Sequence, residues 1–142
     1  MQYWLVKSEP DVYSWDMFVA EQRTFWNGVR NYQARNNLKA MKKGDLVLFY
    51  HSVTHPAIVG IAIVIQEFYQ DTSTEDKNWV VVDIAPHKIL SKPVSLKQIK
   101  LEAILQDMAL IKQSRLSVMP VKAIEFDKIM ELAGEDVAFL HS

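Results

Sequence analysis

Apolar residues in this chain fall into short runs separated by polar turns, a pattern typical of strands connected by loops and short helices. The run Tyr3–Val6 is apolar throughout and predicts a strand buried on both faces. Other β-prone runs predict strands at Leu46–His51, Pro56–Ile65, Trp79–Ile84 and, as an extended piece, Arg115–Val121. The polar stretch Glu67–Lys77 predicts a surface loop between two of them.

Proline and glycine indicate where these strands end or bend. Pro86 is predicted to interrupt the strand that begins at Trp79, and Pro120 to end the last one, because proline donates no hydrogen bond to a sheet. Gly60 lies in the middle of a long aliphatic strand. Glycine at such a position indicates a bulge, a sharp bend or a close approach of another group.

Capping residues and helical spacing predict two helices in the first third of the chain. Ser14 is a suitable N-cap for a helix that reaches about Gln22, and Asn31 for a second helix that stops near Gly44. The inward-facing residues are predicted to be Trp15, Phe18 and Val19 in the first helix, and Ala34, Leu38 and Met41 in the second.

Two further helices are predicted nearer the C-terminus. Ser95 begins an S-x-x-Q capping box and predicts a short helix. A helical pattern then runs from Val121 and stops at Gly134. We expect a helical turn or irregular structure at Leu101–Leu110, and a docked or frayed tail at residues 135–142.

The order of these elements lacks the regular strand–helix–strand alternation of a parallel sheet and predicts a mixed α/β (α+β) fold. About five to six strands with short helices around them are consistent with a small closed or partly open β-barrel. Because 142 residues are the length of one domain, we expect residues 1–142 to form a single unit.

Charge and composition narrow the functional classes. The formal net charge is −1 and the isoelectric point about 6.4, so any nucleic-acid contact has to be local. The absence of cysteine excludes disulfides, thiolate zinc sites and thiol nucleophiles, and fits a reducing cytoplasm. No signal peptide or membrane-spanning run is evident. We expect a cytoplasmic protein, or a nuclear one in a eukaryote.

The sequence carries no recognisable catalytic or metal motif. G-x-S-x-G, H-E-x-x-H and a glycine-rich phosphate loop are all absent, and the chain has only four glycines. His51 and His55 have the spacing of helical metal ligands, but Pro56 and the β-prone run before them disfavour a helix there. We therefore expect no enzymatic activity, no cofactor and no bound metal.

Amide and guanidinium side chains are concentrated within the segment Trp26–His51. Opposite the apolar side of the predicted helix, or just before it, lie Arg30, Asn31, Gln33, Arg35, Asn36 and Asn37. A merely solvated helix would favour Glu and Lys, whereas these groups recognise base edges and phosphates. Trp26 lies beside the Asn27-Gly28 turn, where its indole could stack on a base or close one end of the barrel.

A flipped or single-stranded base is held by stacking and by hydrogen bonds to its edge. We expect aromatic surface to come from Trp26, Tyr32 and Phe49 or Tyr50. Polar contacts with the base edge are expected from Ser8, Asn31, Gln33 and His51. Phosphate or base contacts are expected from Lys7, Arg30, Arg35, Arg115 and Ser117.

Five stretches of the chain together resemble the EVE domain family. They are YWLVKSEP (3–10), GVRNYQARNNL (28–38), GDLVLFYHS (44–52), PAIVGIAIV (56–64) and RLSVMPV (115–121). The resemblance implies a PUA-like fold and a nucleic-acid-binding module, related to YTH and ASCH domains, with a pocket for a modified and by analogy methylated base. In YTH domains a Lys-Ser pair at the same place lines the base pocket. The resemblance therefore implies contacts from Lys7 and Ser8, whereas Glu9 lacks that support.

Two functions remain open at this point. The first is a non-catalytic module that reads a modified base in DNA or RNA. The second is a pocket protein for a small metabolite or a protein partner, in which the Arg/Asn cluster binds a carboxylate or phosphate. The acidic isoelectric point implies that nucleic-acid binding would depend more on the pocket than on the phosphate backbone.

Overall fold

The computed structural model describes residues 1–136, and the tail predicted for residues 135–142 falls almost entirely outside this range. Within it the strands are β1 (Tyr3–Ser8), β2 (Thr24–Phe25), β3 (Leu46–His51), β4 (Ala57–Gln70), β5 (Val80–Ser95) and β6 (Val118–Val121). The helices are α1 (Trp15–Glu21), α2 (Tyr32–Ala40), α3 (Leu96–Leu101), the 3-10 helix η1 (Ala103–Leu105), α4 (Ala109–Lys112) and α5 (Ala123–Leu132). The predicted mixed α/β class is confirmed.

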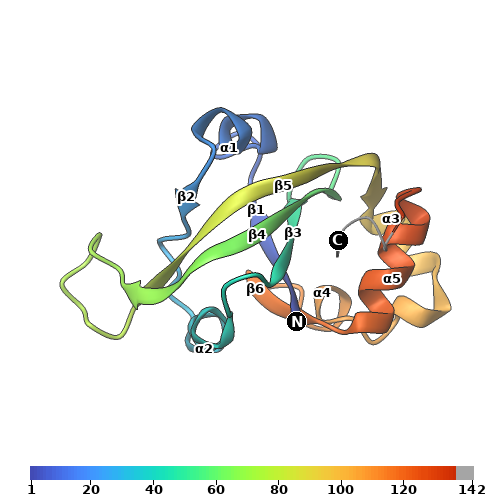
Figure 1. Ribbon diagram of the computed structural model, residues 1–142. Coiled ribbons are helices and arrows are strands. Elements are labelled where there is room, and N and C mark those ends of the chain that lie inside the picture. The colour runs from blue at the N-terminus through green and yellow to red at the C-terminus, as the bar shows by residue number, and fades with distance from the viewer. Residues whose placement is uncertain (137–142) are drawn as a thin grey trace.

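The strands of the described chain form one curved sheet in the order β2-β5-β4-β3-β1-β6. β1 runs parallel to β3, and the other neighbouring pairs are antiparallel. Because the outer strands β2 and β6 do not pair with each other, the barrel is partly open. The long β4–β5 ribbon crosses the molecule, with α1 and α2 on opposite sides of it and α3 and α5 gathered near one end (Figure 1).

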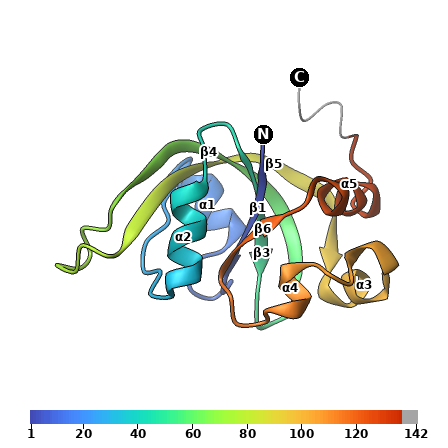
Figure 2. The ribbon, with the colours of Figure 1, turned by 90° about the horizontal axis from the view of Figure 1, so that it is seen from below.

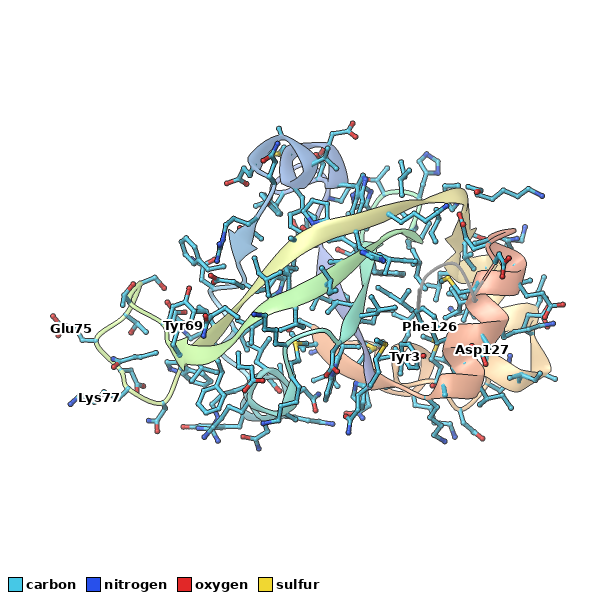
Figure 3. All side chains as sticks on the ribbon, viewed as in Figure 1. Tyr3, Tyr69, Glu75, Lys77, Phe126 and Asp127 are labelled. Atoms are coloured by element: carbon cyan, nitrogen blue, oxygen red, sulfur yellow. The ribbon has the colours of Figure 1, made fainter. Side chains whose placement is uncertain are left out.

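Strands β1 and β3 lie in the middle of the sheet and are covered on both faces. Trp4, Leu5 and Val6 of β1 are all buried, as predicted for a strand covered on both faces, and Leu48 of β3 is buried too. Seen from below, α2 lies across one part of the sheet while α5 and α3 lie at the far end (Figure 2). The ring of Tyr3 in β1 stacks on Phe126 of α5 with centroids 4.1 Å apart, which fixes that helix against the sheet (Figure 3).

The predicted N-caps Ser14 and Asn31 are confirmed, whereas the helix predicted from Val121 starts at Ala123, because Val121 still belongs to β6. The side chain of Ser14 accepts a hydrogen bond from the Met17 amide, and that of Asn31 accepts one from the Ala34 amide. The predicted capping box at Ser95 is also present. Val19, however, was predicted to face inward and is exposed, because in the short α1 Trp15 and Phe18 occupy the buried side.

Proline interrupts the strands less than predicted. β5 continues through Pro86, which lies beside a shift in the β4–β5 register and beyond the two residues of β5 that pair with β2. Pro86 still pairs with Ala62 of β4, but no strand pairs with the other edge of β5 at this point, and a proline is tolerated at such an edge. Pro120 lies inside β6 rather than at its end, and an edge strand tolerates proline. β4 also extends to Gln70 and takes up the start of the predicted loop.

Of the bulge, sharp bend or close approach that Gly60 indicated, the structure shows a close approach together with shifts in strand register. A Cβ atom at this position would lie 2.5 Å from Cη2 of Trp15. Next to Gly60, β4 shifts register against both of its neighbouring strands. Against β3 the shift lies between Phe49 and Tyr50, and against β5 it lies between Ile58 and Gly60. Gly60 thus lets the α1 indole lie directly on the sheet, where it covers one end of the core.

Candidate functional site

A cleft of about 600 Å³, here called the first cleft, lies where the two edges of the sheet fail to meet. One wall is the end of β1 with Lys7, Ser8 and Glu9, and beside it Ser117, whose carbonyl accepts a hydrogen bond from the Lys7 amide at 3.0 Å. The opposite wall is β2 and the following loop, residues 24–30. The open side of the barrel is therefore the concave surface that a planar ligand could enter, and its volume is typical of ligand pockets.

Together with Tyr13 and the exposed Phe25, Trp26 is one of three aromatic residues that line this cleft. Its backbone amide donates to the Val82 carbonyl at 2.8 Å, which continues the pairing of β2 with β5. Its indole meets the rings of Tyr13 and Phe49 edge to face, at centroid distances of 6.2 and 5.7 Å. These contacts hold a half-buried ring in one orientation, as a stacking surface for a flat ligand requires. Burial raises the pKa of Tyr13 to about 12, so this neighbouring phenol stays neutral.

Lys7 and Ser8 form the polar end of β1. The Lys7 ammonium donates to the Ser114 carbonyl at 2.7 Å, and burial lowers the pKa of Lys7. The Ser8 hydroxyl is buried and donates to the carbonyl of Tyr13. Its oxygen can still accept a hydrogen bond from a ligand. Together these groups offer a cation and an acceptor across the cleft from the indole.

Asp71, which follows β4, holds the opposite wall and was missed in the sequence. Its carboxylate is 1% exposed and accepts from the Gly28 amide at 3.1 Å and from the Arg30 guanidinium at 3.2 Å. Burial alone would raise the pKa of Asp71, but hydrogen bonds from Ser73, Gly28 and Arg30 outweigh it and lower the pKa to about 2. The Asp71-x-Ser73 spacing is a recognisable turn signal, yet its pairing with a loop 43 residues earlier carries no local signature.

Three of the predicted site residues line a separate hollow beside the first. This second cleft, of about 330 Å³, is lined by Asn31, Gln33, Gln113, Ser114, Arg115 and Leu116. Asn31 also caps α2, so part of its side chain serves the helix. The structure therefore divides the predicted site: Lys7, Ser8, Trp26, Arg30 and Ser117 lie at the first cleft, and Asn31, Gln33 and Arg115 at the second.

Tyr32 and Arg35 lie on a third surface, next to the β4–β5 loop. The Tyr32 ring is exposed and stacks on Trp79 with centroids 5.1 Å apart. The Arg35 guanidinium lies over Tyr32, 4.8 Å from the ring centre, and also contacts the Asn78 carbonyl and the Asn36 side chain. Neither residue lines the two clefts.

Phe49, Tyr50 and His51 are not brought to either cleft, contrary to the placement expected for them. β3 is a central strand, so Phe49 is fully buried and stacks on Phe18, and Tyr50 is only 4% exposed. Nε2 of His51 accepts a hydrogen bond from the Trp15 amide at 3.0 Å, and burial lowers the pKa of His51 although Asp16 opposes this. This histidine orders the start of α1.

The arrangement of the first cleft suits binding of a flat ring with nearby negative charge. An indole stands on one side, Lys7 on the other, and Arg30 at the rim. Within residues 1–136 no group of three His, Asp or Glu side chains could hold a metal ion. In the same range no helix combines the length and the apolar character needed to cross a membrane.

The comparisons with known proteins identify the family and the fold. The model of the EVE domain family matches residues 2–132. The solved structure of Rpa0253 from Rhodopseudomonas palustris is 46% identical, with a TM-score of 0.90 and 94% of each chain covered. The human THYN1 protein, crystallised with DNA containing 5-methylcytosine, is 32% identical, with a TM-score of 0.88 over 96% of this chain and 99% of the human one.

A more distant structure bears on the fold alone. The ZmASCH protein of Zymomonas mobilis, solved as a mutant, is 12% identical but gives a TM-score of 0.59 over 93% of this chain and 99% of its own. The PUA-like fold that the sequence implied is confirmed, and this ASCH protein shares it.

Proposed function

This chain belongs to the EVE domain family, and on that premise we propose that it is a non-catalytic module that reads a methylated base in DNA. The observation that carries the proposal is the first cleft, where a fixed indole faces the polar end of β1 across the open side of the barrel. The DNA complex of a relative that shares 32% of its residues and nearly all of the fold supports the choice of ligand.

In the proposed mode a base leaves its stack and enters the first cleft. Trp26 stacks on one face of the ring, and such a contact contributes about 1–3 kcal/mol per base. Ser8 accepts a hydrogen bond from the ring edge, while Lys7 and Arg30 meet the adjoining phosphates. The methyl group lies against the apolar residues of the cleft, among them Val29, where burial of one carbon stabilises binding by about 0.8 kcal/mol.

The test is a titration of matched oligonucleotides that differ only in 5-methylcytosine against cytosine at one position. We expect the methylated strand to bind about fourfold more tightly or better, because this is the ratio that burial of one methyl group gives. Equal affinity for the two strands, together with saturable binding of a free nucleoside, would favour the small-ligand alternative instead.

The non-catalytic part of the proposal has its own readout. After long incubation with the protein, mass spectrometry should recover the methylated strand unchanged in length and base composition. A shortened strand or a converted base would show that the chain is an enzyme.

We also propose that the protein acts in the cytoplasm, because its lack of cysteine fits a reducing compartment.

A further inference from the structure

The second cleft continues the first along both of its walls. On one wall Arg30 of the first cleft is followed directly by Asn31 of the second, and on the other Leu116 of the second is followed by Ser117 of the first. The two clefts therefore adjoin, with no residue between their linings at either of these points. A strand with a base in the first cleft can thus place its neighbouring nucleotide over the second.

Lys7 marks the boundary between the two clefts. It lines the first cleft, and its ammonium donates to the carbonyl of Ser114, which lines the second, at 2.7 Å. An ammonium has three hydrogens, so two remain for another acceptor. The phosphate that links two neighbouring nucleotides is such an acceptor and would lie at this boundary.

The chemistry of the second cleft fits a base edge. Gln33 and Gln113 each carry a donor and an acceptor for a base edge, Arg115 adds a guanidinium for the phosphate of the same nucleotide, and no carboxylate lines the cleft. All three side chains are exposed, and within residues 1–136 none of them is engaged in a hydrogen bond with the protein. Amide groups of this kind pair with base edges, most often with adenine.

We infer that the second cleft binds the nucleotide next to the methylated one in the same strand and reads its base through Gln33 and Gln113. The inference rests on the proposed function, because it needs a base in the first cleft to bring the neighbour into place. Recognition by this protein then covers a methylated base together with its sequence context.

The experiment uses a panel of short oligonucleotides with one central 5-methylcytosine and each of the four bases in turn on its 5′ and 3′ sides. The same panel is prepared with unmodified cytosine. We expect the affinity of the wild type to change by about fivefold to a hundredfold with the identity of the base on one of the two sides, which is the range that a good base contact gives. The double variant Gln33→Ala/Gln113→Ala should flatten this variation and keep the ratio between methylated and unmodified strands.

The matched control is Gln70→Ala, which removes an exposed glutamine of β4 outside both clefts and should change neither ratio. A wild type that prefers the methylated strand but binds all flanking bases equally overturns this inference and leaves the proposed function standing. A folded double variant that keeps the flank preference also overturns it. A wild type without methyl preference overturns the proposed function, and this inference with it.

Discussion

Trp26 is the residue on which the proposed ligand most depends. Its indole packs nearly perpendicular to the rings of Tyr13 and Phe49, so its exposed surface is preorganised before a ligand binds. The sequence allowed two roles for Trp26, stacking on a base or closing one end of the barrel. In the structure the barrel end near Trp26 is open, and the ring lines the opening.

Replacement of this ring tests its role directly. Trp26→Ala should weaken binding of a methylated strand by about fivefold to a hundredfold and remove the preference over the unmodified strand, because a stacked base loses about 1–3 kcal/mol. Trp26→Phe, which keeps a smaller ring, should retain part of the preference. Fluorescence anisotropy measures both, with circular dichroism to establish that the variants fold. Full discrimination by a folded Trp26→Ala would remove Trp26 from the pocket.

Asp71 illustrates a different kind of residue, one that touches no proposed ligand and yet shapes the cleft. Its buried carboxylate ties the loop after β4 to Gly28, where φ is +80°, and to Arg30 at the rim. Gly28 tolerates this conformation because it lacks a Cβ atom. Without the carboxylate, the wall that carries Arg30 loses its fixed position.

The stability supplied by Asp71 should depend on pH. Because its folded pKa of about 2 lies below the ordinary 3.8, the ionised group stabilises the protein fully above about pH 4, and this contribution fades as the pH falls toward 2. We expect Asp71→Asn to lower the free energy of unfolding by about 2 kcal/mol at neutral pH, with the difference from the wild type shrinking in acid.

Urea denaturation from neutral pH to about pH 2 measures this difference. Asp11→Asn, which changes an exposed carboxylate, is the control and should follow the wild type at every pH. A deficit of the Asp71→Asn variant that stays constant down to the lowest pH would contradict the account, since the wild-type carboxylate would then not be losing its charge there.

At the scale of elements, α2 explains why the predicted site was divided. Successive residues of a helix point about 100° apart, so a polar run such as 31–35 cannot face a single ligand. Asn31 and Gln33 reach the second cleft, whereas Tyr32 and Arg35, three residues apart, share the side next to Trp79. The sequence identified the composition of this helix correctly, but its orientation depends on packing against β4, β5 and β6.

The contact between α1 and β4 gives a prediction at the same scale. Gly60→Ala should cost about 1–3 kcal/mol of stability, because the new Cβ would lie 2.5 Å from the rigid indole of Trp15. In a Trp15→Leu background, where the flat ring is gone, the same change should cost much less. Thermal or urea unfolding of the four proteins gives the coupling energy. Equal costs in both backgrounds would show that the indole is not what excludes a side chain at position 60.

At the scale of the whole molecule, the strand order decides where the site lies. Apolar runs and caps were enough to predict most strands and helix starts, because these depend on nearby residues. The strand order β2-β5-β4-β3-β1-β6 brings together segments that are far apart in the sequence. The same order creates the gap between β2 and β6 that becomes the first cleft, so neither could be predicted from nearby residues. For the same reason Phe49 and Tyr50 were expected at the site: only the central position of β3 shows that they are buried.

The net charge of −1 gives a last prediction, which concerns the dependence of DNA binding on salt. The protein has no general attraction for a polyanion, so binding should release only the counterions displaced by cations at the clefts, namely Lys7, Arg30 and Arg115. Three phosphate contacts correspond to a slope of log K against log salt concentration of about −2 to −3.

Two variants test which cations set this slope. Arg115→Ala should reduce the magnitude of the slope by about one. Lys97→Ala should leave it unchanged, because Lys97 is an exposed residue of α3 that lines neither cleft. Titrations at several salt concentrations measure these slopes. A wild-type slope steeper than about −6 would mean that backbone contacts dominate, and the pocket would then no longer account for the affinity.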